Sequence, residues 1–223
     1  MVFGQCRAFI QMNSKKSTIL FIDGNNLYHN LRQMKIKPSN LDFDKFVNLI
    51  CSRFNLELKT VNYYNSMPTL KDGKDLYYSH LKFLNNLNKL PKFKVITRKL
   101  QVHSNKELIK EKRDLIESMD LCDSCRPIVE ENILDVIGNV KKKEKGVDVK
   151  LAVDLIDSAN ENDANILILV SGDADFIPAL ESAQKKGAQI LSSSVVKGYS
   201  KHLRDFCPFF AIGRNKLIEN CLN

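Results

Sequence analysis

The chain has 223 residues, 43% of them hydrophobic, and carries a formal net charge of +8. A chain of this length can bury one full core, so we expect a single α/β domain rather than two. The absence of any apolar run of about 18 residues argues against a membrane span, and the positive charge favours a polyanionic partner such as RNA or DNA.

The first 16 residues precede the first strong strand signal. Their apolar patch is short, is interrupted by Arg7 and Gln11, and lacks the order of regions that a secretion signal needs. We expect residues 1–16 to form a flexible N-terminal arm, with Met12 as an alternative translation start.

Short apolar runs rich in branched residues predict strands that are buried on both faces, as in a parallel sheet. In chain order these runs are 18–23, 58–65, 93–99, 165–173, 188–194 and 209–213. Helical spacing occurs between them, at 43–54, 75–88, 148–160 and 175–186. Strands and helices therefore alternate, which predicts a doubly wound α/β layer fold.

The segment 101–145 interrupts this alternation, because it carries many charges and Pro127 but no clear buried strand. We predict a mostly helical, charged insertion that ends in the basic loop KKKEKG, residues 141–146. The domain itself is expected to span residues 17–213, with 214–223 as a C-terminal tail.

Carboxylates follow two of the predicted strands. Asp23 ends the first strand, where Gly24 permits a sharp turn, and Asp173 and Asp175 follow the run ILILV. Ligands of open parallel sheets bind outside the carboxyl ends of the strands. These acids are therefore expected at one edge of the sheet.

The predicted helix 148–160 supplies further acids. The spacing 148, 152, 155, 159 gives an apolar stripe with Asp148 at its N-terminal end, so we expect Asp148 to point toward the sheet. Asp154 falls on a charged face, and we expect it to meet water and pair with Lys150.

Several carboxylates in one cleft repel one another unless a cation is present. Oxygen ligands select Mg²⁺ or Mn²⁺, and such an ion can activate water and stabilise charge on a phosphodiester. We interpret Asp23, Asp148, Asp173 and Asp175 as a catalytic, metal-binding set, with Asp175 as a ligand or as the group that orients the water. The alternative for Asp148, Asp173 and Asp175 taken singly is a helix-capping role.

Substrate contacts are expected from neighbouring polar residues. The Asn26 amide is placed to support Asp23 or a phosphate, although Asn26 also suits a plain turn. The basic loop would hold the substrate backbone through its lysines, which are Lys141, Lys142, Lys143 and Lys145.

Three segments resemble the motifs of NYN-domain proteins of the LabA-like group, within the PIN-like nuclease superfamily. They are FIDGNNLYHNLR, KGVDVKLAVDLI and LVSGDADFIPALESAQKKGAQI, in the family's order, and the similarity spans residues 17–213. The resemblance implies a three-layer αβα PIN-like (Rossmannoid) fold with a central, mostly parallel sheet, and divalent-metal RNase activity.

In the family's pattern, the acidic residues match Asp23 in the first block, Asp148 in the second, and Asp173 with Asp175 in the third. Asp154 matches a further acid that is frequent in the second block. The stretch 97–146 is longer than the basic pattern needs, so the substrate groove is expected to be remodelled.

The combined prediction is a Mg²⁺- or Mn²⁺-dependent ribonuclease acting on RNA, single-stranded in our interpretation. The alternative is an RNA-binding or regulatory module of the same fold with little or no turnover. A phosphatase with an aspartate nucleophile is less well supported, since GNN rather than a second carboxylate follows Asp23. The sequence leaves homo-oligomerisation open.

Two other patterns have more than one interpretation. Cys122 and Cys125 form a CxxC, which suits a zinc site only if further ligands come close, and ordinary reduced thiols otherwise. The uneven spacing of the six cysteines fits a reducing, cytoplasmic location. The tyrosines at 63, 64, 77 and 78 are candidates for stacking on bases or for core packing.

Overall fold

The computed structural model describes residues 15–68, 70–99, 110, 113–129, 146–161 and 163–222. The chain divides into two compact units, Met1–Arg98 with Gly146–Asn223, and Lys99–Lys145.

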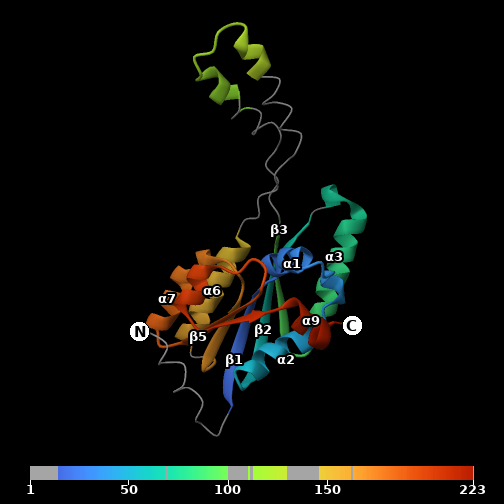
Figure 1. The fold of residues 1–223 in the computed structure, drawn as a ribbon, viewed down its shortest axis with the longest axis vertical. Helices are drawn as coiled ribbons and strands as arrows, with labels where there is room; N and C mark the ends of the chain where they lie inside the picture. The colour runs from blue at the N-terminus through green and yellow to red at the C-terminus, as the bar shows by residue number, and fades with distance from the viewer. Residues whose placement is uncertain are drawn as a thin grey trace. The chain divides into compact units, whose positions relative to one another are not determined.

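A six-stranded, all-parallel sheet forms the centre of the first unit, with the strand order β3-β2-β1-β4-β5-β6 (Figure 1). The strands are β1 (Lys16–Asp23), β2 (Leu56–Met67), β3 (Phe93–Lys99), β4 (Ile166–Val170), β5 (Gln189–Val195) and β6 (Phe209–Ile212). All six predicted strands are present. β4 is buried along its whole length, as expected for a strand covered on both faces.

Helices cover both faces of the sheet and complete the three layers. One face carries α1 (Gly24–Gln33), α2 (Phe43–Arg53), α3 (Lys74–Leu87) and α9 (Arg214–Cys221). The other carries α6 (Val147–Asn160), α7 (Ile177–Lys185) and α8 (Lys201–Phe206). Along β1, Leu20 and Ile22 pack toward the first group, whereas Ile19 and Phe21 pack toward the second. This architecture confirms the predicted αβα fold.

Several elements differ from the sequence-based expectation. Helices α1, α8 and α9 were not predicted, and the predicted helix 175–186 begins as a short 3-10 helix, η5 (Ala174–Phe176), before α7. Two more 3-10 helices are η2 (Pro38–Asn40) and η3 (Leu70–Asp72).

The segment 214–223, expected as a tail, instead contains α9. Leu217 and Cys221 of this helix are fully buried, and the amide of Asp42 donates to the carbonyl of Cys221. Burying these apolar side chains stabilises the packed arrangement over a solvated tail.

In the second unit, residues 113–117 and 125–129 are helical. The lysines of the predicted basic loop, residues 141–145, lie outside the described residues. No helix in the described part of the chain is long and apolar enough to cross a membrane.

Candidate functional site

Asp23 lies at the carboxyl end of β1 and caps the helix that follows. Asp23 is only 5% exposed, and its Oδ1 accepts a hydrogen bond of 3.0 Å from the backbone N of Asn26. The chain can turn from strand into helix here because Gly24 has no side chain. A Cβ on Gly24 would lie 2.5 Å from Cζ of Tyr63 and 2.6 Å from the carbonyl oxygen of Tyr64.

Ser171 joins the ends of β1 and β4. Its Oγ donates to Asp23 Oδ2 over 3.0 Å and accepts from the backbone N of Asp173 over 3.1 Å. The register pairs Ile22 with Val170, so the next residues on the two strands lie side by side. The buried hydroxyl of Ser171 therefore bridges the carboxylate of Asp23 and the backbone of Asp173.

The side chain of Asn26 connects α1 to the loop after β4 by a hydrogen bond. Its Oδ1 accepts from the backbone N of Gly172 at 2.9 Å and from Nδ2 of Asn30 at 2.7 Å. Gly172 approaches the loop after β5 so closely that a Cβ would lie 1.9 Å from the carbonyl oxygen of Gly198. This packing fixes the backbone that carries Asp173.

Asp173 and Asp175 occupy one turn but differ in exposure. Asp173 is half-buried, and its Oδ1 accepts from the backbone N of Asp175 at 3.0 Å, which makes it the N-cap of η5. Asp175 is exposed. The capping alternative thus holds for Asp173, but a cap uses only part of the acceptor capacity of a carboxylate.

The expected orientation of Asp148 is wrong. Asp148 is exposed in the first turn of α6, whose buried stripe is Val147, Leu151, Leu155 and Ala159. This stripe buries the large side chains of Val147 and Leu151, which stabilises the helix more than burying Ala152 would. Asp148 therefore lies one residue out of phase with the predicted face, and Gly146, not Asp148, is the N-cap.

Asp154 lies closer to the sheet than the sequence suggested. It is half-buried, and its Oδ2 accepts a 2.9 Å hydrogen bond from the hydroxyl of Tyr64. Tyr64 is the register partner of Asp23 on β2, so this acid is tied to the same strand edge. The expected pair with Lys150 is confirmed, at 2.5 Å.

Sequence reasoning missed Ser171 and Tyr64 as parts of this edge. Ser171 stands in the same VSGDAD stretch as the aspartates, directly after a buried strand, and that position was the available signal. Across residues 15–68, 70–99, 113–129, 146–161 and 163–222, no group of three His, Cys, Asp or Glu residues is close enough to hold a metal ion.

The described cysteines are all free thiols. Cys51 and Cys207 are buried in the clusters on opposite faces of the sheet, and Cys122 and Cys125 are exposed in the second unit. His103, a further residue of a type that binds zinc, lies outside the described residues. The described residues therefore do not assemble a zinc site around the CxxC.

Comparison with known proteins agrees with this geometry. The NYN domain family matches residues 17–212. A crystal structure of a protein of unknown function from Vibrio parahaemolyticus RIMD 2210633 has a similar fold, with a TM-score of 0.53 and 19% identity. That alignment covers 96% of this chain and 100% of that chain. No curated protein matches the sequence.

The three-layer αβα fold around an all-parallel sheet is consistent with the PIN-like class, to which the NYN family belongs. Within that class, the chain belongs to the NYN-domain family. Members of this family generally bind RNA, and PIN-like nucleases usually use divalent metals. The finer placement in the LabA-like group stays a prediction from the three sequence blocks.

Proposed function

We propose that the protein is a Mg²⁺- or Mn²⁺-dependent ribonuclease that hydrolyses phosphodiester bonds of RNA at the strand edge formed by Asp23 and Asp173. The observation that carries this proposal is the nearly complete burial of Asp23, joined through the Ser171 hydroxyl to the backbone of Asp173. Burying a carboxylate is costly, so its retention at a ligand-binding edge favours a functional role.

The donor chemistry fits a hard divalent cation. Carboxylates from two adjacent strand ends supply only oxygen, and Mg²⁺ keeps several waters while using one or two carboxylates. A site of this type does not need three convergent acids, which agrees with their absence from the described residues. When bound, the ion would activate water and stabilise charge on the phosphodiester.

We assign the remaining roles by position. Asp173 would bind the ion with Asp23, and exposed Asp148 and Asp175 would act through bound water or orient it. Nδ2 of Asn26 has no hydrogen-bond partner among the described residues, so it is available to a phosphate oxygen. The lysines at 141, 142, 143 and 145 stay proposed phosphate contacts.

The test is cleavage of labelled single-stranded RNA in Mg²⁺, in Mn²⁺ and in EDTA. Asp23→Asn and Asp173→Asn should each reduce cleavage to the level of EDTA-treated wild type. Circular dichroism should show that both variants keep the fold. The matched control is Asp157→Asn, which removes an exposed carboxylate of α6 and should cleave like wild type. Full activity in both site variants would contradict the assignment.

An RNA-binding module without turnover is the second candidate. The exposed position of Asp148 and the absence of any group of three potential metal ligands among the described residues favour it. This candidate predicts binding of RNA that persists in EDTA, without cleavage in either metal. We place either activity in a reducing, cytoplasmic compartment, since the described cysteines are free thiols.

A further inference from the structure

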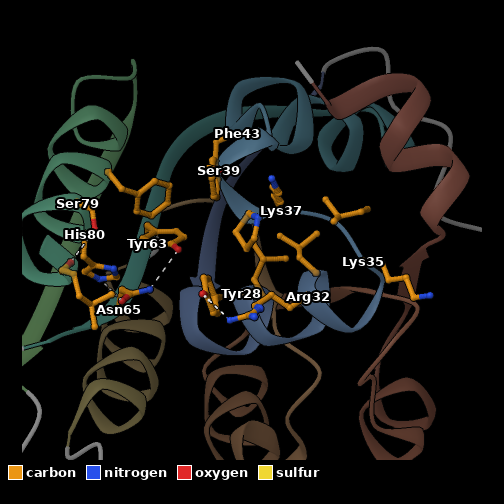
Figure 2. A pocket seen from close by; sticks show the side chains of 16 residues that line it. Tyr28, Arg32, Lys35, Lys37, Ser39, Phe43, Tyr63, Asn65, Ser79 and His80 are labelled. Atoms are coloured by element: carbon orange, nitrogen blue, oxygen red, sulfur yellow. Dashed lines mark hydrogen bonds between the residues drawn. The ribbon is translucent and has the colours of Figure 1, made fainter. Parts of the chain in front are cut away.

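A pocket of about 570 Å³ lies between α1, η2, β2 and α3, on the face of the sheet that these helices cover (Figure 2). Its volume lies within the range of small-molecule sites. Phe43, Phe83 and Tyr63 supply aromatic walls, and Tyr28, on the α1 side, is 42% exposed. Helix α3 packs on the core only near its C-terminal end, where its buried residues Leu84 and Leu87 lie.

A row of polar groups lies along one side of the pocket. Asn65 is only 3% exposed, its Nδ2 lies 3.4 Å from the hydroxyl of Tyr63, and its Oδ1 lies 3.0 Å from Nε2 of His80. Figure 2 shows these three side chains together, with Tyr28 and Arg32 on the α1 side. Buried amide and hydroxyl groups beside aromatic walls suit a flat ligand with a polar edge.

The charge that surrounds the pocket is positive. Arg32, Lys35 and Lys37 line it, and none of the described lining residues is acidic. In the described part of the chain these three side chains form no ion pair. The guanidinium carbon of Arg32 lies 5.8 Å from the centroid of the Tyr28 ring. An aromatic surface beside uncompensated cations suits a ligand that is both planar and anionic.

The pocket adjoins the strand-end acids. Tyr63, in its wall, fills the space next to Gly24, the residue after Asp23. Burial raises the pKa of the Tyr63 hydroxyl, and the charge of Asp23 raises it further. Tyr28 follows Asp23 by five residues, about 7.5 Å along the axis of α1 at the usual helical rise. A base in the pocket and a phosphate at Asp23 can therefore belong to neighbouring parts of one strand.

We propose that this pocket binds one unpaired base of a single-stranded RNA, with the base against Tyr28 and its phosphate on Arg32. That RNA is the ligand rests on the proposed function. The inference adds a particular place in the fold where one base of that RNA binds. A base held in a duplex cannot enter a side pocket without unpairing, so the site selects single strands. Stacking is tolerant of sequence because every base has a π-face.

The first test fills the pocket without changing charge. Ser79 is exposed on α3, lines the pocket, and donates to the carbonyl of Leu76 three residues earlier in its helix. Ser79→Trp should weaken binding of a labelled single-stranded oligoribonucleotide in EDTA by about tenfold or more, the loss expected when one base no longer stacks. Ser52→Trp is the matched control, because Ser52 is exposed on α2 and donates to Leu49 in the same way.

The second test removes one phosphate contact. Arg32→Gln should weaken binding severalfold and lower its salt dependence by about one counterion. Arg53→Gln is the matched change, because Arg53, like Arg32, lies in the last turn of its helix. The guanidinium carbon of Arg53 is 5.9 Å from the centroid of the Phe210 ring. The control should bind like wild type, so an effect of net charge alone would appear equally in both variants.

The outcomes separate the pocket from the nuclease. If wild type binds RNA without cleaving it, and Ser79→Trp loses this binding while Ser52→Trp keeps it, the result would support the base pocket. The same result would contradict the proposed ribonuclease activity. Metal-dependent cleavage and binding that are unchanged in Ser79→Trp would overturn the pocket and leave the ribonuclease standing. Equal affinity for single strands and duplex, or no binding of single-stranded RNA, would also overturn the inference.

Discussion

Gly24 shows how one residue can fix the position of a carboxylate at a strand end. It is buried in the first turn of α1, between Asp23 and the backbone of β2. At an ordinary helical site, alanine stabilises a helix by about 1 kcal/mol relative to glycine. Here the added methyl would overlap Tyr63 and the carbonyl of Tyr64.

We therefore expect Gly24→Ala to lower the free energy of unfolding by about 1–3 kcal/mol, the usual cost of overpacking. Urea denaturation provides the measurement. Gly213→Ala is the control, because a Cβ there would meet only a methyl of Val196 at 3.9 Å. If Gly24→Ala were as stable as wild type, the close contact with Tyr63 would be wrong.

Among the described cysteines, we expect Cys122 to have the most reactive thiol. Hydrogen bonds with the Ser124 hydroxyl and then with Cys125 lower its pKa to about 7, whereas burial raises the pKa of Cys51 to about 11. Since the thiolate is the nucleophile, iodoacetamide should modify Cys122 first, with a rate that rises most steeply near pH 7. Peptide mass spectrometry after short exposures measures this.

Ser124→Ala supplies the control for Cys122, because it removes the hydrogen bond with the largest effect on the pKa. The reactivity profile of Cys122 should then move to higher pH while that of Cys51 stays unchanged. An identical profile in the variant would show that the Ser124 contact does not set the thiol pKa.

At the scale of single elements, the positions of the strands were easier to predict than which side of each helix is buried. Branched apolar runs such as ILILV allow only burial on both faces, and β4 is buried throughout. In α6 the sequence permits two stripes that share Leu155 and Ala159 and differ by one residue at their first two positions. The structure selects the stripe with Val147 and Leu151, a choice made by side-chain volume against the sheet that spacing alone does not reveal.

The contact between α3 and β2 contains a titratable group. Burial lowers the pKa of His80 below its ordinary value of 6.5, and a backbone hydrogen bond with Ser66 offsets part of this effect. In the folded state His80 therefore binds a proton less readily than in the unfolded chain. Its contribution to stability is present above pH 6.5 and is lost as the pH falls through the lower, folded pKa.

We expect the melting temperature of wild type to fall between pH 7 and pH 5 more steeply than that of His80→Gln, which cannot take up this proton. Thermal unfolding across that range, in buffers of equal ionic strength, measures the two slopes. Parallel slopes would mean that His80 is not linked to folding in this way.

At the scale of the whole molecule, the fold class and the strand-end acids could be predicted, because strand alternation and motif order are properties of the chain. The pocket could not, since its walls come from residues between Leu27 and Phe83 that only the fold brings together. Ser171 was missed for a related reason. Its role depends on the register of β4 against β1, which no local pattern encodes.

We propose that Asp23 and Asp173 together hold one divalent cation. Titration with Mn²⁺, monitored by the electron paramagnetic resonance signal of the free ion, tests this directly, because a contaminating ribonuclease cannot imitate it. We predict one site in wild type, its affinity strongly reduced in both Asp23→Asn and Asp173→Asn and unchanged in Asp157→Asn. Wild-type affinity in both site variants would contradict the account.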